Sequence, residues 1–326
     1  MPAITWWHTL LGRKRPALEP ATGICTPSQR AYKLIPSPPD ARDVVFDVAK
    51  ATPGPLHGAL RAAAEAFAAI PTHVVPAPAK ALAVIKPAPL PPAGAAAPPS
   101  PPVSVDMRAF MPPVLDQGTL GSCASNATSN VLRLLLSKEL LRVFQPSRLF
   151  LYYNTRVRVE GSPADEDTGV CIRDVFKAIA QYHVCDEVDW PYVVSRFSAA
   201  PSAVAVANAA THLKIQYSSV PQVLASMKAV LALGHPIVVG IQVYESFESD
   251  AVANTGIVPT PVPGGAEQCL GGHAVVVCGY CDATGRFLVQ NSWGTAWGLK
   301  GYFWLDYKYL TNPLLAGDFW IASTFV

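Results

Sequence analysis

The strongest chemical candidate in the sequence is Cys123, which follows a glycine-broken run at 117–122. After this cysteine, apolar residues recur at helical spacing, at Ala124, Ala127, Val131, Leu134 and Leu135. Cys123 is therefore predicted to lie at a helix N-terminus, where unpaired N–H groups and the helix dipole favour negative charge. Such an environment lowers the pKa of a thiol and makes the nucleophilic thiolate available.

A thiolate nucleophile needs an imidazole partner, and the imidazole needs a group that orients it. His273 follows two glycines and begins an apolar, β-branched run, and Asn291 follows the next run of this kind. His273 would accept the thiol proton and later return it to a leaving amine. The alternative interpretation is a buried core histidine together with an inert buried cysteine.

These residues, in this order and at this spacing, resemble the motifs of the papain/cathepsin family of cysteine peptidases. The shared positions are Gln117, Gly121-Ser122-Cys123, His273-Ala274, Asn291-Ser292-Trp293-Gly294, Trp297-Gly298 and Gly301-Tyr302. The resemblance implies hydrolysis of peptide bonds through a Cys thiolate/His imidazolium pair and an acyl-enzyme intermediate. It also implies that Asn291 orients His273, that Gln117 and the Cys123 N–H bind the oxyanion, and that Trp293 shields the His–Asn bond from water.

The resemblance extends, with departures, to the substrate-binding residues. Where the family has a glycine pair that bonds the substrate backbone, this chain has Gly169-Val170 and so keeps half of the pair. Ala124 replaces the aromatic residue that usually follows the nucleophile. Asp318 would stand at the far end of the S2 pocket and favour a basic P2 side chain, or else be an ordinary solvated carboxylate. The remaining residues that the resemblance places around S2 are Cys171, Ile172, Gly240, Gly271 and Gly272.

Hydrophobic periodicity predicts helices in the first half of the catalytic region and strands in the second. The expected helices, besides the one at Cys123, are 147–153 and 172–182, and the expected strands are 236–243, 272–280, 286–290 and 301–305. This order indicates an α+β fold. The resemblance specifies a two-lobed papain-like fold, with a helical lobe at about 106–215, a β-barrel-like lobe at about 216–326 and the active site in the cleft between them.

The N-terminal region, 1–102, is an atypical pro-region ahead of a catalytic domain at 103–326. Residues 56–70 favour a helix by propensity, and 71–102 form a Pro/Ala-rich linker. The stretch 32–43 resembles a leader found before papain-like domains in some bacteria and large DNA viruses, where it runs over the catalytic groove. The alternative is a proline-ordered linker without such a role.

Composition narrows the class of protein. The 326 residues carry a net charge of +2, which gives no sign of a nucleic-acid-binding surface, so nucleic-acid binding is not expected. No apolar run approaches the length of a membrane span, and the first residues make a poor signal peptide. The Cys278-x-x-Cys281 pair lacks a second ligand pair, so neither a metal nor a cofactor is predicted. Localisation stays open, and the resemblance suggests a lysosome-like compartment, a virion or secretion.

Three functions are compatible with the motifs. The first is a peptidase whose partners are protein or peptide substrates and whose own N-terminal segment is an intramolecular inhibitor. The second is a catalytically silent, cathepsin-like binding or structural protein. The third is acyl transfer or cross-linking by the same thioester chemistry, which differs only in the acceptor.

Overall fold

The computed structural model describes residues 30–48, 51, 58, 101–139, 144–209 and 215–324. The expected helix at 56–70 and the linker at 71–102 therefore lie outside the described residues, apart from Gly58 and residues 101–102.

The described part of the first half of residues 103–326 is mainly helical, as the periodicity predicts. Its helices are α2 (Cys123–Glu139), α3 (Arg148–Tyr153), α4 (Ile172–Tyr182) and α5 (Ala203–Ala209), with a π-helical turn η2 (Asn154–Val159) and a 3-10 turn η3 (Val194–Arg196). Ser147 caps α3, because its side chain accepts a hydrogen bond from the backbone N–H of Phe150. The strongly amphipathic α4 buries the face that carries Ile172, Val175 and Ile179.

The second half supplies most of an antiparallel sheet. The strands are β1 (Ser104–Asp106), β2 (Ile215–Ser219), β3 (Ile237–Tyr244), β4 (Cys269–Cys281), β5 (Arg286–Gln290), β6 (Tyr302–Asp306) and β7 (Ala316–Thr324). The main strand order is β2-β7-β3-β4-β5-β6, and β1 pairs with β4. Strands β2 and β6 stand at opposite ends of this order, so the sheet is open rather than the closed barrel that a β-barrel-like lobe would suggest.

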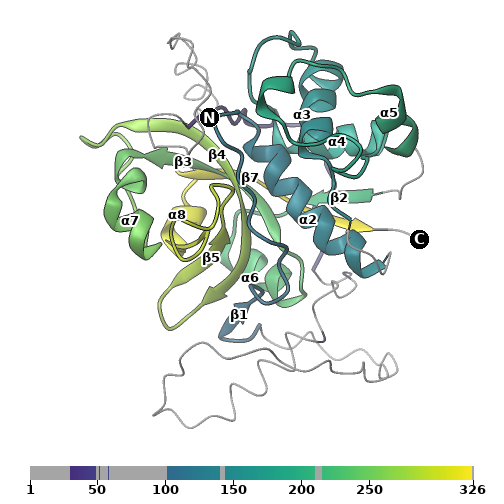
Figure 1. Ribbon diagram of the computed structural model, residues 1–326. Helices are drawn as coiled ribbons and strands as arrows, with labels where there is room; N and C mark the ends of the chain where they lie inside the picture. The colour runs from purple at the N-terminus through teal and green to yellow at the C-terminus, as the bar shows by residue number, and fades with distance from the viewer. Residues whose placement is uncertain are drawn as a thin grey trace, which may run out of the picture.

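The sheet is buried on both faces at its centre. Val275, Val276 and Val277 follow one another on β4 and are each at most 1% exposed, although successive side chains of a strand point to opposite faces. Helix α2 contacts β4, β3 and β7, and α6 (Leu224–Ala232) contacts β3 and β4. Figure 1 shows α2 lying between the sheet and the group formed by α3, α4 and α5. The two-part α+β architecture is confirmed.

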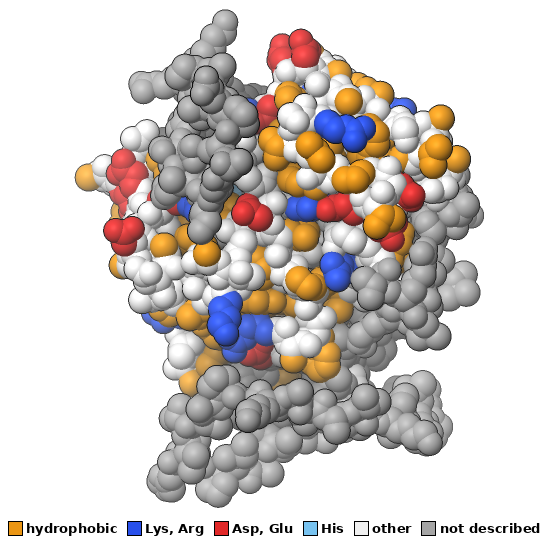
Figure 2. Space-filling model, viewed as in Figure 1, with side chains coloured by type: hydrophobic (Ala, Val, Ile, Leu, Met, Phe, Trp, Pro, Cys, Tyr) orange, Lys and Arg blue, Asp and Glu red, His pale blue; other side chains and the backbone are white. Residues whose placement is uncertain are grey.

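The remaining elements flank the sheet. They are the 3-10 turn η4 (Glu245–Glu248) and the helices α7 (Asp250–Thr255) and α8 (Tyr307–Thr311). Among the residues that the structure describes, no helix is long and apolar enough to cross a membrane. On the face in Figure 2, the described basic and acidic side chains are scattered among hydrophobic and neutral ones.

Candidate active site

Cys123 is the first residue of α2, and its side chain is almost fully buried. The loop before it turns at Gly118, whose φ of 59° lies in the left-handed region that glycine adopts without strain. Burial raises the pKa of the Cys123 thiol to about 11. The backbone N–H groups of Ala274 and Ala124 oppose that shift, and the first of these belongs to the residue after His273. The thiol is therefore next to β4, at the junction of the helical part and the sheet.

His273 and Asn291 form a bonded pair whose protonation can be deduced. His273 Nε2 lies 2.8 Å from Asn291 Oδ1, and the same oxygen accepts the backbone N–H of Ser292 at 2.8 Å. The Ser292 bond identifies that amide atom as the oxygen, so Nε2 must carry the proton. Nδ1 of the neutral ring then holds a lone pair, and among the described residues it has no hydrogen-bond partner. The ring is prepared to act as a base through Nδ1.

Among the described residues no hydrogen bond joins the Cys123 thiol to His273 Nδ1, and burial favours the neutral form of both groups. His273 is fully buried, and burial lowers its pKa to about 4, which outweighs the Asn291 hydrogen bond that raises it. Because the pKa of Cys123 is shifted in the opposite direction, the thiol and the imidazole remain uncharged across the neutral range. A site of this kind needs solvent or substrate contact to reach the thiolate–imidazolium state.

Gln117 is fixed by Ser292, the residue next to Asn291. The Ser292 hydroxyl donates to Gln117 Oε1 at 2.7 Å, and the Gln117 backbone N–H donates to the Ser292 carbonyl at 2.9 Å. The amide nitrogen Nε2 donates to the Leu120 carbonyl at 3.1 Å and keeps a second N–H. One short segment, 291–292, thus orients both the imidazole and the glutamine amide.

Trp293 lies against the face of the histidine ring. The two ring centroids are 4.8 Å apart and the rings are stacked at 24°. Phe247 and Trp297 support the indole by edge contacts at 5.5 and 5.0 Å, so its position is set by an aromatic cluster.

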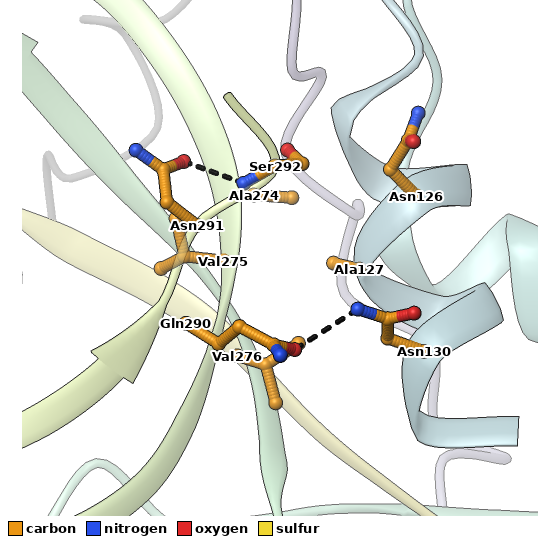
Figure 3. A pocket seen from close by; sticks show the side chains of 9 residues that line it. All are labelled: Asn126, Ala127, Asn130, Ala274, Val275, Val276, Gln290, Asn291 and Ser292. Atoms are coloured by element: carbon orange, nitrogen blue, oxygen red, sulfur yellow. Dashed lines mark hydrogen bonds between the residues drawn. The ribbon is translucent and has the colours of Figure 1, made fainter. Parts of the chain in front are cut away.

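An amide pair that sequence reasoning missed joins α2 to the sheet behind the site. Asn130 Nδ2 donates to Gln290 Oε1 at 3.0 Å, and Gln290 Nε2 donates to the Pro112 carbonyl at 2.9 Å. Figure 3 shows these two amides joined by this hydrogen bond beside a small cavity that both line, with Asn291 following Gln290 in the chain. The pair fixes the helix that carries Cys123 relative to β5, which Asn291 directly follows.

An N-terminal segment, residues 30–48, lies across this site, and we call it the strap. Its backbone pairs with both sides of the cleft, since the Leu34 N–H donates to the Gly272 carbonyl at 3.2 Å and the Ile35 N–H to the Val170 carbonyl at 3.4 Å. The Tyr32 ring meets the edges of His273 and Trp293, with centroid distances of 6.4 and 6.1 Å. The strap contributes to the burial of the site.

The substrate-pocket residues named from the sequence are in contact with the strap. A Cβ on Gly240 would stand 2.7 Å from Leu34 Cδ2 and 3.8 Å from Ile172 Cδ1, so Leu34 occupies the groove between them. The thiol of Cys171 lies 3.5 Å from the Pro36 carbonyl oxygen. Gly169 has a φ of 79°, and the Lys33 carbonyl oxygen lies where the Cβ of any other residue at this position would stand.

Asp318 lies at the end of this groove and is bonded rather than freely solvated. It accepts the backbone N–H and the hydroxyl of Ser37 at 3.1 and 2.8 Å, and the Trp320 indole N–H at 2.5 Å. Burial raises the pKa of Asp318 above its ordinary value. With Leu34, Gly240 and Gly317 it lines a cavity of about 110 Å³.

Ion pairs and backbone bonds hold the strap at its ends. Arg30 pairs with Glu248, and its guanidinium lies 4.0 Å from the centroid of the Trp293 ring. Arg173, itself 3% exposed, bonds the Pro38 carbonyl and pairs with Asp43 at 3.0 Å. Further along, the Phe46 N–H donates to the Ser219 carbonyl at 2.8 Å. Periodicity gave no signal for Glu248 or Arg173, because their partners lie far away in the sequence.

The described cysteines are all free thiols, and one of them belongs to a cluster of potential metal ligands. Glu160, Cys171 and Asp174 lie with their ligand atoms within 4.8 Å of one another. Glu160 accepts the Cys171 N–H at 2.8 Å through Oε1 and Asp174 pairs with Lys177 at 2.9 Å, while Glu160 Oε2 is buried without a hydrogen-bond partner among the described residues. No metal is assigned to this cluster.

Comparison with known proteins agrees with this geometry. Residues 101–312 match the model of the papain family cysteine proteases. An uncharacterized peptidase C1-like protein of Acanthamoeba polyphaga mimivirus is 42% identical over 218 residues, which cover 64% of this chain and 69% of the viral protein. Cysteine proteinase 3 of Entamoeba histolytica is 27% identical over 63% of this chain and 62% of its own length.

Solved structures give the same assignment. Xylellain, a cysteine protease from Xylella fastidiosa, matches with a TM-score of 0.69 and 30% identity over 91% of this chain and 97% of its own. A digestive procathepsin L 3 of Tenebrio molitor shares the fold at 21% identity and a TM-score of 0.53, over 69% and 70% of the two chains. The chain belongs to the papain family of cysteine proteases. It is accordingly a peptidase of the hydrolase class.

Proposed function

We propose that this chain cleaves peptide bonds through Cys123 and His273, and that the strap holds it in a masked, zymogen-like state. The observation that carries the proposal is the His273–Asn291 bond, which leaves Nδ1 as the free base beside the N-terminus of α2. Asn291 orients the ring, and Gln117 and the Cys123 N–H stabilise the oxyanion. The catalytic domain is the region from about 103 to 326, with 1–102 as its pro-region.

The reaction follows from these positions. Nδ1 takes the thiol proton, the thiolate attacks the scissile carbonyl, and His273 then protonates the leaving amine to give the acyl-enzyme. Water, activated by the same nitrogen, releases the acyl group and restores the thiol. The pair Gly169-Val170 and Gly272 offer backbone groups to the substrate, as the Val170 and Gly272 carbonyls do to the strap, and Cys171, Ile172, Gly240 and Asp318 surround the neighbouring side chain.

Masking by the strap is supported by the burial of the reacting groups. Cys123 is 1% exposed and His273 is 0% exposed. Tyr32 lies on the His273 side, where the leaving amine must be protonated, and Leu34 lies on the acyl side. A substrate has its acyl residue before its leaving residue, so the strap runs in the opposite direction and does not offer its own amide for cleavage.

The test uses the full-length chain and a substitution that expels the strap. Leu34→Glu places a carboxylate in the apolar groove at Gly240, where burial of an unpaired charge is unfavourable. We expect labelling of Cys123 by an epoxysuccinyl inhibitor, followed by intact mass, to accelerate at least about tenfold, together with turnover of a mixed peptide library. Val44→Glu is the matched control, because Val44 belongs to the same strap and is 64% exposed.

Two further variants separate the functional alternatives. In the Leu34→Glu background, Cys123→Ala should abolish labelling and turnover, whereas Cys278→Ala, which removes another fully buried thiol, should retain both. Cleavage that persists in the Cys123→Ala variant would refute the assignment of Cys123 as the nucleophile. Labelling without turnover would favour the silent binding protein, and products that carry an added amine would indicate acyl transfer.

A further inference from the structure

The acidic loop at 160–168 places one carboxylate, Asp167, beside the catalytic centre, and no catalytic step described above uses it. Asp167 accepts the backbone N–H of Gly121 at 3.2 and 3.1 Å from its two oxygens. Gly121 is two residues before Cys123. Asp167 also contributes to the raised pKa of the Cys123 thiol, as expected for a negative charge close to the sulfur.

The position of Asp167 is built into the fold. The Tyr152 hydroxyl donates to Asp167 Oδ1 and accepts the backbone N–H of Gly169 at 3.1 Å. Tyr152 is fully buried on α3, so a single rigid side chain fixes both the carboxylate and the glycine that bounds the cleft. The Asp167 side chain is 18% exposed, and it binds one residue of the cleft.

That cleft residue is Lys33 of the strap. Lys33 Nζ lies 2.8 Å from Asp167 Oδ2 and also bonds the Asp167 carbonyl. A Cβ on Gly121 would meet Lys33 Cδ at 2.9 Å and Lys33 Cβ at 3.0 Å, so the aliphatic stem lies in a groove that exists because residue 121 has no side chain. The groove therefore has glycine as its floor and an anionic end, which complements a lysine or arginine side chain.

The chemistry of the proposed reaction fixes which substrate residue would enter this groove. His273 must protonate the leaving amine, so the residue on the leaving side lies where Tyr32 meets His273 and Trp293. Lys33 occupies the adjoining position, between Gly169 and Gly272. In a bound substrate this position would be filled by the residue whose carbonyl Cys123 attacks.

We propose that Asp167 forms the end of an S1 subsite that selects lysine or arginine immediately before the scissile bond, and that Lys33 occupies this subsite in the masked enzyme. The proposal rests on the proposed peptidase function and adds the substrate class. Asp167 is a specificity residue, since it contacts the substrate side chain and not the reacting atoms.

The experiment compares two peptides that differ only at the residue before the scissile bond, lysine or the uncharged norleucine. The protein is the full chain that carries Lys33→Glu and Leu34→Glu, which frees the groove. We expect kcat/KM to favour lysine at least about tenfold, and Asp167→Asn to bring this ratio close to one. Because both rates come from one preparation, the ratio does not depend on the fraction of folded enzyme.

Asp165→Asn is the matched control, since Asp165 is an exposed aspartate of the same loop, and it should keep the lysine preference. Equal rates for the two peptides, or a lysine preference that survives Asp167→Asn, would overturn the assignment. Binding of the same peptides is also measured with the strap variant that carries Cys123→Ala in addition. This measurement separates the subsite proposal from the peptidase proposal. If the strap variant cleaves neither peptide, the proposal of peptide hydrolysis is refuted. The subsite is still supported if the lysine peptide binds more tightly than the norleucine peptide and this difference is lost in Asp167→Asn.

Discussion

At the scale of single residues, burial sets the protonation of the proposed catalytic pair. Cys123 and His273 are both buried, and burial disfavours the thiolate and the imidazolium alike. The helix N-terminus and the N–H of Ala274 favour the thiolate but do not overcome burial while the strap is in place. The proposed masking would thus act electrostatically as well as sterically.

The His273 shift makes a prediction about stability. The pKa of His273 is about 4 in the folded chain and about 6.5 in the unfolded chain, so the unfolded state binds more protons between these values. The free energy of unfolding should therefore fall as the pH falls from about 6.5 to about 4, by up to about 3 kcal/mol from this residue. Urea denaturation at a series of pH values, wild type against His273→Gln, isolates the contribution.

The difference between the two curves should shrink toward acid pH. A wild-type minus His273→Gln difference that is flat between pH 4 and 6.5 would contradict a buried neutral imidazole.

At the scale of elements, α2 and the sheet are joined through a buried amide pair. Asn130 comes from α2 and Gln290 from the end of β5, and the Asn130 Nδ2 to Gln290 Oε1 distance is 3.0 Å. The same two elements carry or adjoin Cys123 and Asn291, so this bond couples stability to the geometry of the site (Figure 3). Pairings of this kind give uniqueness to an interface that apolar contacts alone would leave less specific.

Removing the amide of Asn130 should be costly. Asn130→Ala leaves Gln290 Oε1 buried without this donor, and we expect the free energy of unfolding to fall by about 1–3 kcal/mol. Asn254→Ala, the same substitution at an exposed position of α7, should change it by less than about 0.5 kcal/mol. Equal effects of the two substitutions in urea denaturation would show that the pair contributes nothing specific.

At the scale of the whole molecule, the strap connects parts of the chain that lie far apart in the sequence. It contacts η4 through Glu248, the helical part through Arg173 and Asp167, and the sheet through Gly272 and Ser219. Its release would therefore uncover one continuous groove.

A strap anchored by several modest contacts should loosen in steps. Asp43→Asn removes the charge that faces Arg173, and we expect inhibitor labelling of Cys123 to accelerate a few-fold, because partly exposed ion pairs each contribute about 1 kcal/mol or less. Asp40→Asn is the matched control, since Asp40 pairs with Arg42 inside the strap. Identical labelling rates for Asp43→Asn and wild type would show that the Arg173–Asp43 ion pair does not hold the strap in place.

The sequence by itself determined the family, the α+β class and the extent of α4, because the motif residues are local and α4 has a clear apolar face. It also singled out Cys123, His273, Asn291 and Gln117, whose catalytic roles remain proposals. Only the tertiary structure brought Lys33 to Asp167, Leu34 to Gly240 and Asn130 to Gln290. Contacts between segments far apart leave no periodic signal in either segment. Strand order is also set by such contacts, so the sequence did not predict that the sheet is open. Folding decides these contacts, since each requires that both segments already be in place.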